Sequence, residues 1–269
     1  MRLKKEYTEW VKRKYLISHA LACKVTGWCR TSQYYTQLMP AKDAVLKELI
    51  SGVIGASRKG RNKVIVLLQR KNPQLSKSKI RRVYQKEGFS LFKRPRKRVA
   101  NNPANPIIVP FSKNVEWAMD FMSDSLANGR RLRTLNIIDH FNRSCLGVEV
   151  EHSFPARRVT AILDRIIEEK GKPQIIRTDN GPEFTSKYFQ LWLRERKIRW
   201  APIEKGAPQQ NGIIERFNRT YREEVLDANV FSSLKSAKEM TRVFIEDYNN
   251  HRPHEALGNK TPNEYAKVA

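Results

Sequence analysis

Cysteine and long apolar runs are scarce in this chain of 269 residues. It has three cysteines, Cys23, Cys29 and Cys145, and none of them forms a Cys-x-x-Cys pair. A sparse, odd set of cysteines favours reduced thiols over a disulfide framework, and His19 with the first two cysteines matches no usual zinc spacing. No run approaches the roughly 20 apolar residues of a membrane span, and residues 1–14 lack the apolar region of a signal peptide. We therefore expect a cytoplasmic protein that does not enter membranes.

Acidic residues are scarce in only one part of the chain. Residues 1–100 hold 26 Lys and Arg against 5 Asp and Glu, a net charge of +21, whereas residues 101–269 hold 26 against 22, a net charge of +4. A strongly basic segment predicts a polyanionic partner. A basic binding region followed by a region that carries the acids is what a nucleic-acid-processing enzyme requires.

The first hundred residues predict helices only. Residues 15–35 indicate two short helices joined at Gly27, because apolar residues recur there at helical spacing and glycine suits the turn. Two further apolar stripes, within 45–53 and 64–68, indicate two more helices, and Pro73 ends the second of them.

A last basic helix is expected before residue 90. Ser76 or Ser78 can cap it, and Gly88 can end it. Its inward residues are Ile80, Val83 and Tyr84. Its outer side carries Lys77, Lys79, Arg81 and Arg82. A basic helix that follows a tight turn suits helix-turn-helix contact with DNA, and the alternative is a solvated basic face on an ordinary helical bundle. The charge of the region favours DNA contact.

A concentrated run of positive charge follows these helices. We interpret it as an extended arm that tracks DNA phosphates through Lys93, Arg94, Arg96, Lys97 and Arg98. Prolines and asparagines then indicate a linker over residues 101–109. The predicted division is therefore a helical DNA-binding region over 1–100 and a second domain over 110–269.

Beyond the linker the pattern changes to strands and helices. The expected strands are 115–123, 132–139, 145–151, 173–179 and 198–203. The expected helices are 159–167, 184–197, 210–228 and 233–249. This order predicts an α/β domain with a mixed five-stranded sheet and helices on its faces, and it matches the ribonuclease-H-like fold.

Three carboxylates stand in contexts that suit one site. Asp120 lies inside an apolar strand, where an unpaired carboxylate is costly. Asp179, where a strand ends, is separated from Asp120 by 58 residues, and Glu215, on the first turns of a helix, is separated from Asp179 by 35 residues. Any one of them alone is better explained as a turn or ion-pairing residue. The three together favour a shared metal site.

The chemistry of these acids suits phosphoryl transfer on DNA. Mg²⁺ prefers hard oxygen ligands, and two such ions can activate a nucleophile and stabilise the leaving oxygen. The chain offers no Cys or Ser with a fitting base and no Gly-rich phosphate loop with Lys, so covalent catalysis and nucleotide hydrolysis are disfavoured. On the helix of Glu215, Arg219 and Arg222 follow on the same side, opposite a core-facing stripe made of Ile214, Phe217 and Tyr221.

Other acids and the histidines receive ordinary interpretations. Asp124 and Asp139 lie at strand ends and are expected to form turns or hydrogen bonds. Glu183 can orient the loop of Asp179, although Phe184 beside it is typical of the start of a helix. The histidines at 140, 152, 251 and 254 show no metal-ligand spacing, and they are interpreted as structural or DNA-contacting.

The motifs around these acids carry a resemblance that spans nearly the whole chain. Trp117-Ala118-Met119-Asp120-Phe121, Thr178-Asp179-Asn180-Gly181-Pro182-Glu183-Phe184 and Asn211-Gly212-Ile213-Ile214-Glu215-Arg216-Phe217-Asn218-Arg219-Thr220 resemble the three acid motifs of the DDE transposases of the insertion-sequence-3 family, OrfB type. Tyr248-Asn249-Asn250-His251-Arg252-Pro253-His254, with Leu257-Gly258 and Thr261-Pro262, resembles the C-terminal signature of that family. Residues 60–95 are similar to its helix-turn-helix segment.

The resemblance implies a bacterial transposase associated with the nucleoid, with a catalytic core like that of retroviral integrases. It implies that Asp120, Asp179 and Glu215 are catalytic ligands of two Mg²⁺ ions, for which Mn²⁺ can substitute. It implies metal-dependent cleavage that frees a 3′-OH at the end of the element, followed by attack of this hydroxyl on another phosphodiester.

The resemblance also implies DNA contacts near the acids. Arg222 falls where the family has a basic residue that contacts DNA, and Arg219 is expected beside it. The loop over 205–212 resembles the mobile active-site loop of the family, and its Lys205 and Asn211 are further expected DNA contacts. The implied partners are double-stranded DNA, as element ends and as target, and a second copy of the chain on that DNA.

Two other functions compete with the transposase. Other ribonuclease-H-like nucleases lack the 35-residue spacing and the Asn-Gly-x-x-Glu-Arg loop. A DNA-binding regulatory or accessory fragment would need an upstream reading frame for activity. The family commonly joins to such a frame by frameshifting, and no sustained heptad pattern precedes the helices here. We therefore expect that this chain can be the downstream portion of such a fusion.

Overall fold

The computed structural model describes residues 2–31, 39–55, 59–89, 110–204 and 208–268. Contacts between residues divide the chain into two compact units, 1–52 and 53–269, and each is described by itself. The predicted arm over 93–98 and the predicted linker over 101–109 lie outside the described residues. The domain boundary expected near residue 100 therefore stays a prediction.

The described part of the first unit is helical. Helix α1 spans Arg2–Tyr15 and α2 spans His19–Thr26, while α4, Met39–Ile54, begins in this unit and ends in the second. Ser18 caps α2 by accepting a hydrogen bond from an amide of its first turn. Gly27 ends α2 with a φ of +64°, a left-handed conformation that favours glycine. The predicted turn at Gly27 is confirmed, whereas the apolar pattern does not predict α1, since charged residues dominate it.

Two helices, α5 at Arg61–Lys71 and α6 at Lys77–Lys86, follow α4. Ser76 is the N-cap of α6, because its hydroxyl accepts a hydrogen bond of 3.3 Å from the backbone amide of Lys79. The buried residues of α6 are Ile80, Val83 and Tyr84. Its exposed residues include Lys77, Lys79, Arg81 and Arg82. The predicted inward and outward faces of this helix are confirmed.

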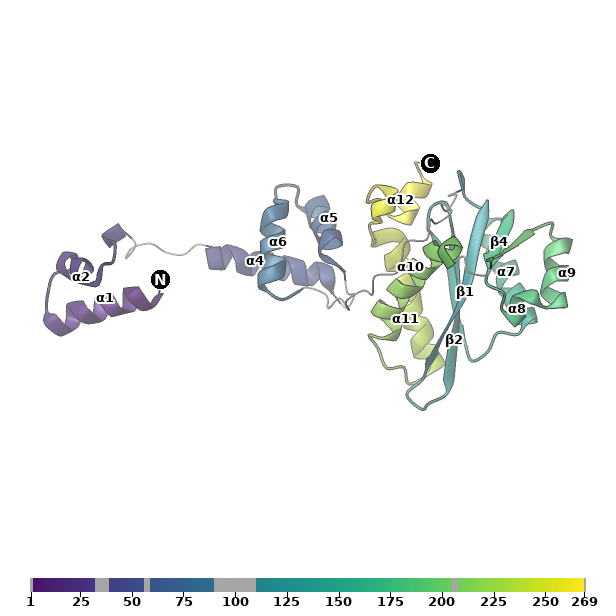
Figure 1. The fold of residues 1–269 in the computed structure, drawn as a ribbon, viewed down its shortest axis with the longest axis horizontal. Coiled ribbons are helices and arrows are strands. Elements are labelled where there is room, and N and C mark those ends of the chain that lie inside the picture. Colours follow the sequence, from purple (N-terminus) through teal and green to yellow (C-terminus); the bar gives the residue numbers. More distant parts are fainter. Residues whose placement is uncertain (1, 32–38, 56–58, 90–109, 205–207, 269) are drawn as a thin grey trace. The chain divides into compact units, whose positions relative to one another are not determined.

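The second unit is built on a mixed five-stranded sheet (Figure 1). Its strands are β1 at Glu116–Ser125, β2 at Arg131–Asp139, β3 at Cys145–Glu151, β4 at Ile175–Thr178 and β5 at Arg199–Pro202. The spatial order is β3-β2-β1-β4-β5, in which β1, β2 and β3 pair antiparallel and β4 pairs parallel with both β1 and β5. The sheet with its flanking helices confirms the ribonuclease-H-like fold expected from the sequence.

Helices cover both faces of this sheet, as Figure 1 shows. One face carries α7 at Ala156–Lys170, α8 at Pro182–Thr185 and α9 at Lys187–Glu195. The other carries α10 at Gly212–Tyr221 and α11 at Leu234–Glu246, with α12 at Pro262–Ala266 near the end of the chain. Short helical turns complete the unit: η1 at Pro208–Asn211, η2 at Arg222–Leu226, η3 at Asp247–His251 and η4 at Glu255–Leu257.

The structure corrects three of the expected helices. The helix predicted over 184–197 is interrupted at Ser186, whose hydroxyl accepts a hydrogen bond from the Phe189 amide and starts α9 as a new helix. The helix predicted over 210–228 changes at Arg222 from an α-helix to one π-helical turn, and the helix predicted over 233–249 changes in the same way at Asp247. These changes come from local hydrogen bonding that apolar spacing does not report.

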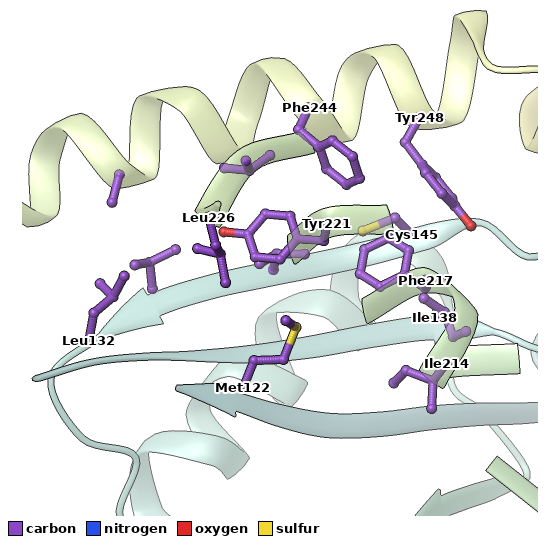
Figure 2. Close-up of a cluster of buried hydrophobic side chains, with 14 of the residues drawn as sticks. Met122, Leu132, Ile138, Cys145, Ile214, Phe217, Tyr221, Leu226, Phe244 and Tyr248 are labelled. Carbon is purple, nitrogen blue, oxygen red and sulfur yellow. The ribbon is translucent and has the colours of Figure 1, made fainter. Parts of the chain in front are cut away.

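Two apolar clusters bind the helices to the sheet. One joins α7, α8 and α9 to β1, β2 and β4, and Trp117, Met119 and Phe184 are fully buried in it. The other joins α10 and α11 to the opposite face. Figure 2 shows Phe217 and Tyr221 between the sheet and helix α11. Burial of such large rings stabilises the fold most, at roughly 25 cal/mol per Å² of apolar surface removed from water.

In the part of the chain that the structure describes, no helix combines the length and apolar character that a membrane crossing needs.

Candidate active site

The first two acids are brought together by the pairing of β1 with β4. These strands run parallel, with Trp117 opposite Ile176 and Ala118 opposite Arg177. Continuing this register by two residues sets Asp179, which lies just beyond the end of β4, beside Asp120. The sequence predicts both strands, but it does not give their pairing, because the pairing joins segments that are distant in the chain.

Asp120 is a partly buried carboxylate among other negative charges. Burial raises its pKa, and the charges of Asp179 and Glu215 raise it further, to about 6. The Phe121 amide, at 2.8 Å, and the Asn218 side-chain amide, at 2.7 Å, donate hydrogen bonds to it and oppose this shift. Asp179, from a strand end, and Glu215, from a helix, therefore both act electrostatically on Asp120.

A buried amide connects the helix of Glu215 to the strand of Asp120. Asn218 donates through Nδ2 to Asp120 Oδ2, and its Oδ1 accepts a hydrogen bond of 2.7 Å from Asn136 Nδ2. Asn136 lies directly opposite Asp120 in the β1–β2 pair and is fully buried. The sequence reasoning missed both asparagines. The available signal was the position of Asn218, three residues after Glu215 and thus close to it on the helix surface.

Helix α10 presents Glu215 as the sequence predicts. Ile214, Phe217 and Tyr221 are buried against the sheet, whereas Glu215 and Arg219 are exposed on the other side of the helix. Because residues four apart are neighbours on a helix, the carboxylate of Glu215 and the guanidinium of Arg219 share one surface. This surface can hold a cation and a phosphate side by side.

Asp179 is exposed at the start of a short loop between β4 and α8. The Gly181 amide donates a hydrogen bond of 3.2 Å to Asp179 Oδ1 and fixes the side chain against its own turn. Asn180 donates through Nδ2 to the carbonyl oxygen of Ile203 at 3.0 Å, which joins this loop to the segment that follows β5. The expected turn at Asn180-Gly181 thus also positions the second acid.

The arrangement of the acids is open. Within residues 2–268, apart from the undescribed segments, no three His, Cys, Asp or Glu side chains are gathered closely enough to hold a metal ion. The three carboxylates thus do not form a closed ligand set, and the metal centre stays a prediction. Mutual repulsion among like charges opposes their closer approach.

Arg222, expected to contact DNA, is held within the chain. Its Nη2 donates a hydrogen bond of 3.0 Å to the carbonyl oxygen of Ser123, and its Nη1 lies 3.6 Å from carboxylate oxygens of both Asp124 and Asp227. These contacts hold the π-helical turn η2 against the end of β1. A role in DNA binding stays a prediction for Arg222 and for the exposed Arg219.

The other expected DNA contacts fall in different surroundings. Asn211 is only 5% exposed, which does not favour the predicted contact. Lys205 lies outside the described residues, as do the five basic residues of the predicted arm, Lys93, Arg94, Arg96, Lys97 and Arg98. Nothing in the structure bears on these six.

Three further acids agree with the sequence interpretation. Asp139 accepts hydrogen bonds of 2.8 Å from the amides of Asn114 and Phe141, and Asp124 accepts one from its neighbour in the chain. Glu183 pairs with Arg133 of β2, a partner that the sequence does not indicate.

One buried acid, Glu116, was missed by the sequence reasoning. Burial alone would raise its pKa, but contacts with His140 and Arg177 outweigh burial and lower the pKa to about 2. Arg177 lies on β4, so its ion pair with Glu116 joins β1 to β4. It is therefore structural.

The C-terminal signature also has a structural role in the fold. Tyr248 is buried in the apolar cluster under α11, and Asn249 exchanges hydrogen bonds of 2.9 and 2.8 Å with the backbone of Cys145 on β3. Arg252 is 1% exposed and forms an ion pair with the buried Glu224 of η2. The signature therefore fixes the end of the chain against the sheet and against the turn that follows α10.

Comparison with known proteins agrees with this geometry. Residues 112–208 and residues 196–262 match two families described as integrase core domains. The chain is 30% identical over 257 residues to an uncharacterized 31.7 kDa protein of insertion element IS407 from Burkholderia multivorans, which covers 95% of this chain and 93% of that protein. This chain belongs to the DDE transposases of the insertion-sequence-3 family.

Two further relatives support this placement. An uncharacterized 39.2 kDa protein of insertion element IS476 from Xanthomonas euvesicatoria is 32% identical over 251 residues, 93% of this chain and 72% of that protein. The putative transposase InsK of IS150 from Escherichia coli is 26% identical over 154 residues, 56% of this chain and 54% of that protein.

Among solved structures, the fold is similar to the simian T-cell lymphotropic virus intasome in complex with a PP2A regulatory subunit. The TM-score is 0.51 at 17% identity, over 82% of this chain and 74% of that chain. The transposase therefore shares the fold of a retroviral integrase core, as the sequence predicts.

Proposed function

We propose that this transposase cuts and joins DNA at Asp120, Asp179 and Glu215, which hold two divalent metal ions. One observation carries the proposal. The parallel register of β1 with β4 sets Asp179 beside Asp120, and after burial itself the charges of Asp179 and Glu215 raise the pKa of Asp120. Metal-dependent phosphoryl transfer needs several carboxylates close together, because they bind the metal ions.

The chemistry of the donor set fits Mg²⁺ or Mn²⁺. All three groups are hard oxygen ligands, and two of them, Asp179 and Glu215, are exposed and can approach an ion from solvent. The repulsion that raises the pKa of Asp120 is a surplus of negative potential, which divalent cations offset. The integrase core family as a whole is metal-dependent.

The chain prepares each carboxylate for this task. Asn218 holds Asp120 by a hydrogen bond to one oxygen, which orients the other oxygen and favours the ionised form. The Gly181 amide orients Asp179 in the same way, and the buried face of α10 fixes Glu215. When bound, the ions supply activation of the attacking hydroxyl and stabilisation of the leaving oxygen.

Two successive displacements at phosphorus make up the proposed reaction. A water molecule attacks the phosphodiester at the end of the element, and the bond to the 3′ oxygen breaks to leave a free 3′-OH. This hydroxyl then attacks a second phosphodiester, forming one new P–O bond as another breaks. Arg219, exposed one turn after Glu215, can bind the phosphate through its guanidinium.

The proposed partner is double-stranded DNA, bound both as element end and as target. Positive charge on α6 and on the predicted arm supports phosphate binding, which does not depend on sequence. Because two element ends must meet, we propose that two or more chains act together on DNA. The structural relative is itself an intasome, an assembly on DNA. We also propose that the chain acts with, or fused to, the product of an upstream reading frame, and that it is located at the nucleoid.

A strand-transfer assay tests the proposal. Purified protein is incubated with Mg²⁺ or Mn²⁺ and labelled DNA that carries the ends of the host element, alongside Glu215→Gln and Asp179→Asn. Glu149→Gln is the control, because Glu149 pairs with Arg165 on α7 away from the acids. We expect both site variants to bind DNA but to form no joined product, and the control to join normally.

Two other outcomes would count against the proposal. Joining by the site variants at the wild-type rate would show that the acids are wrongly placed in the mechanism. Salt-sensitive DNA binding without any joining by the wild type would favour the regulatory or accessory fragment. That alternative is not favoured, because the chain has all three acids and two of them act electrostatically on Asp120.

A further inference from the structure

An ion pair connects the middle of the sheet to the helix that follows the second acid. Arg133 of β2 donates through Nη1 to Glu183 Oε1 of α8 at 2.6 Å. The two side chains are 23% and 16% exposed, so water screens this pair less than a surface pair. The guanidinium carbon of Arg133 also lies 4.4 Å from the centre of the Phe121 ring. Phe121 is the residue that follows Asp120 in the chain.

The other oxygen of Glu183 faces the turn of Asp179. A Cβ atom built on Gly181 would lie 3.3 Å from Glu183 Oε2 and 3.2 Å from Asp179 Oδ1. Both carboxylates therefore meet at Gly181, whose amide already donates to Asp179. Arg133 therefore holds a carboxylate that lies beside the turn of the second acid.

Helix α8 depends on its surroundings, because it spans only Pro182–Thr185 and is too short to be stable on its own. Phe184 packs against Phe121, with ring centres 5.1 Å apart, and its carbonyl oxygen accepts a hydrogen bond of 2.8 Å from Gln190. The ion pair at Glu183 adds a charged, directional anchor on the side of the turn that holds Asp179.

We infer that Arg133 is a positioning residue for Asp179, acting through Glu183. The inference rests on the proposed function, since it assumes that Asp179 is a metal ligand. Asp120 points to the face that carries α10, where it meets Asn218, whereas Arg133 and Glu183 lie with Phe121 and Phe184 on the other face. The two acids are therefore positioned from opposite sides of the sheet.

The pair also controls the charge beside Asp179. The guanidinium of Arg133 offsets the negative charge that the carboxylate of Glu183 brings beside the second acid. Without Arg133, an unpaired negative charge next to Asp179 would repel it and shift the turn. Removal of either partner should therefore weaken metal binding even though neither touches the metal, as is usual for groups that orient metal ligands.

The test uses Arg133→Gln, Glu183→Gln and the double variant in the full chain. Amide hydrogen exchange of residues 179–185 is measured first, without metal. Both single variants should exchange faster there, because the Phe184 and Thr185 amides, which donate to the Gly181 carbonyl, lose their support. The double variant should match the more affected single variant, since both changes remove the same interaction.

The affinity for Mn²⁺ is measured next by calorimetric titration. The dissociation constant should rise by roughly 10- to 100-fold in each single variant and no further in the double variant. Arg133→Lys, which keeps the charge, should recover most of the affinity. Glu149→Gln removes a comparable ion pair from β3 and α7 and should bind Mn²⁺ like the wild type.

Two results would overturn the inference. One is exchange and Mn²⁺ affinity within about twofold of the wild type in both single variants. The other is effects that add in the double variant, as expected for independent sites. A different pair of results would count against the proposed function: Asp179→Asn loses Mn²⁺ binding, but the wild type forms no joined product. The exchange measurement would still decide the role of Arg133.

Discussion

Asn218 donates a hydrogen bond of 2.7 Å to Asp120 and thereby joins the helix of the third acid to the strand of the first. Glu215 lies three residues earlier on the same helix, so one amide fixes the distance between two of the carboxylates. Asn136 completes this arrangement from β2 by donating to Asn218. The geometry of the site therefore depends on a neutral residue as much as on the acids.

Replacing Asn218 with Ala tests this dependence. The change leaves the buried amide of Asn136 without its acceptor and frees Asp120, so we expect a loss of about 1–3 kcal/mol in the free energy of unfolding. Joining should fall by roughly 10- to 100-fold, because a group that orients a metal ligand is lost. Urea unfolding and strand-transfer rates measure the two effects. Asn229→Ala, which removes a hydrogen bond to the Val225 carbonyl, is the matched control, and equal joining by both variants would contradict this role.

The raised pKa of Asp120 predicts a pH-dependent stability. Because folding raises this pKa from 3.8 to about 6, the folded protein binds more protons than the unfolded chain between these pH values. The free energy of unfolding of the metal-free protein should therefore fall as the pH rises through this window. Asp120→Asn should remove that slope and stabilise the metal-free protein at pH 7 by about 1–3 kcal/mol, while abolishing joining. Urea unfolding at several pH values measures it, and an unchanged slope would show that Asp120 is not the group responsible.

A methyl group at Gly181 should disturb the second acid without straining the backbone. The φ of Gly181 is −59°, which alanine adopts freely, but its Cβ would meet Asp179 Oδ1 at 3.2 Å and Glu183 Oε2 at 3.3 Å. We expect Gly181→Ala to fold normally and to bind Mn²⁺ several-fold more weakly, as measured by titration. Gly52→Ala, where no atom lies within 4 Å of the added Cβ, is the control. Wild-type affinity in Gly181→Ala would mean that the turn adjusts at no cost to Asp179.

The buried ion pair of the C-terminal signature predicts a large effect on stability. Arg252→Leu leaves Glu224 charged and without its partner in the apolar interior, so we expect a loss of about 3–5 kcal/mol in the free energy of unfolding. The double change of Arg252 and Glu224 to leucine should cost less, because no buried charge is left over. Urea unfolding of both variants distinguishes this from a loss of packing alone, for which the double variant would be the less stable of the two.

Charge in the predicted arm over 93–98 should govern DNA affinity. Replacing Lys93, Arg94, Arg96, Lys97 and Arg98 with glutamine should weaken binding about equally for all DNA sequences. It should also lower the slope of log affinity against log salt by up to about 0.9 for each phosphate that the arm no longer neutralises. Binding measured at several salt concentrations on related and unrelated DNA tests it. A weaker affinity confined to one DNA sequence would mean that the arm reads bases.

Much of this protein could be predicted from local patterns. The strand and helix order follows from apolar spacing, and the inward face of α6 and the buried face of α10 appear in the structure as expected. The identity of the acids follows from their motifs and their spacing. The predicted helix bounds were wrong where local hydrogen bonding decides them. At Ser186 a hydroxyl caps a new helix, and at Arg222 the α-helix becomes a π-helical turn.

The sequence by itself determined which residues we propose to carry the chemistry, because residue type and chain spacing are local properties of the chain. Only the tertiary structure decided how they meet. The parallel register of β1 with β4, the amide of Asn218 between two elements and the pairing of Arg133 with Glu183 join residues that are 50 or more positions apart. Such contacts are selected by packing and by the pairing of buried polar groups in the folded chain, and no local pattern records them.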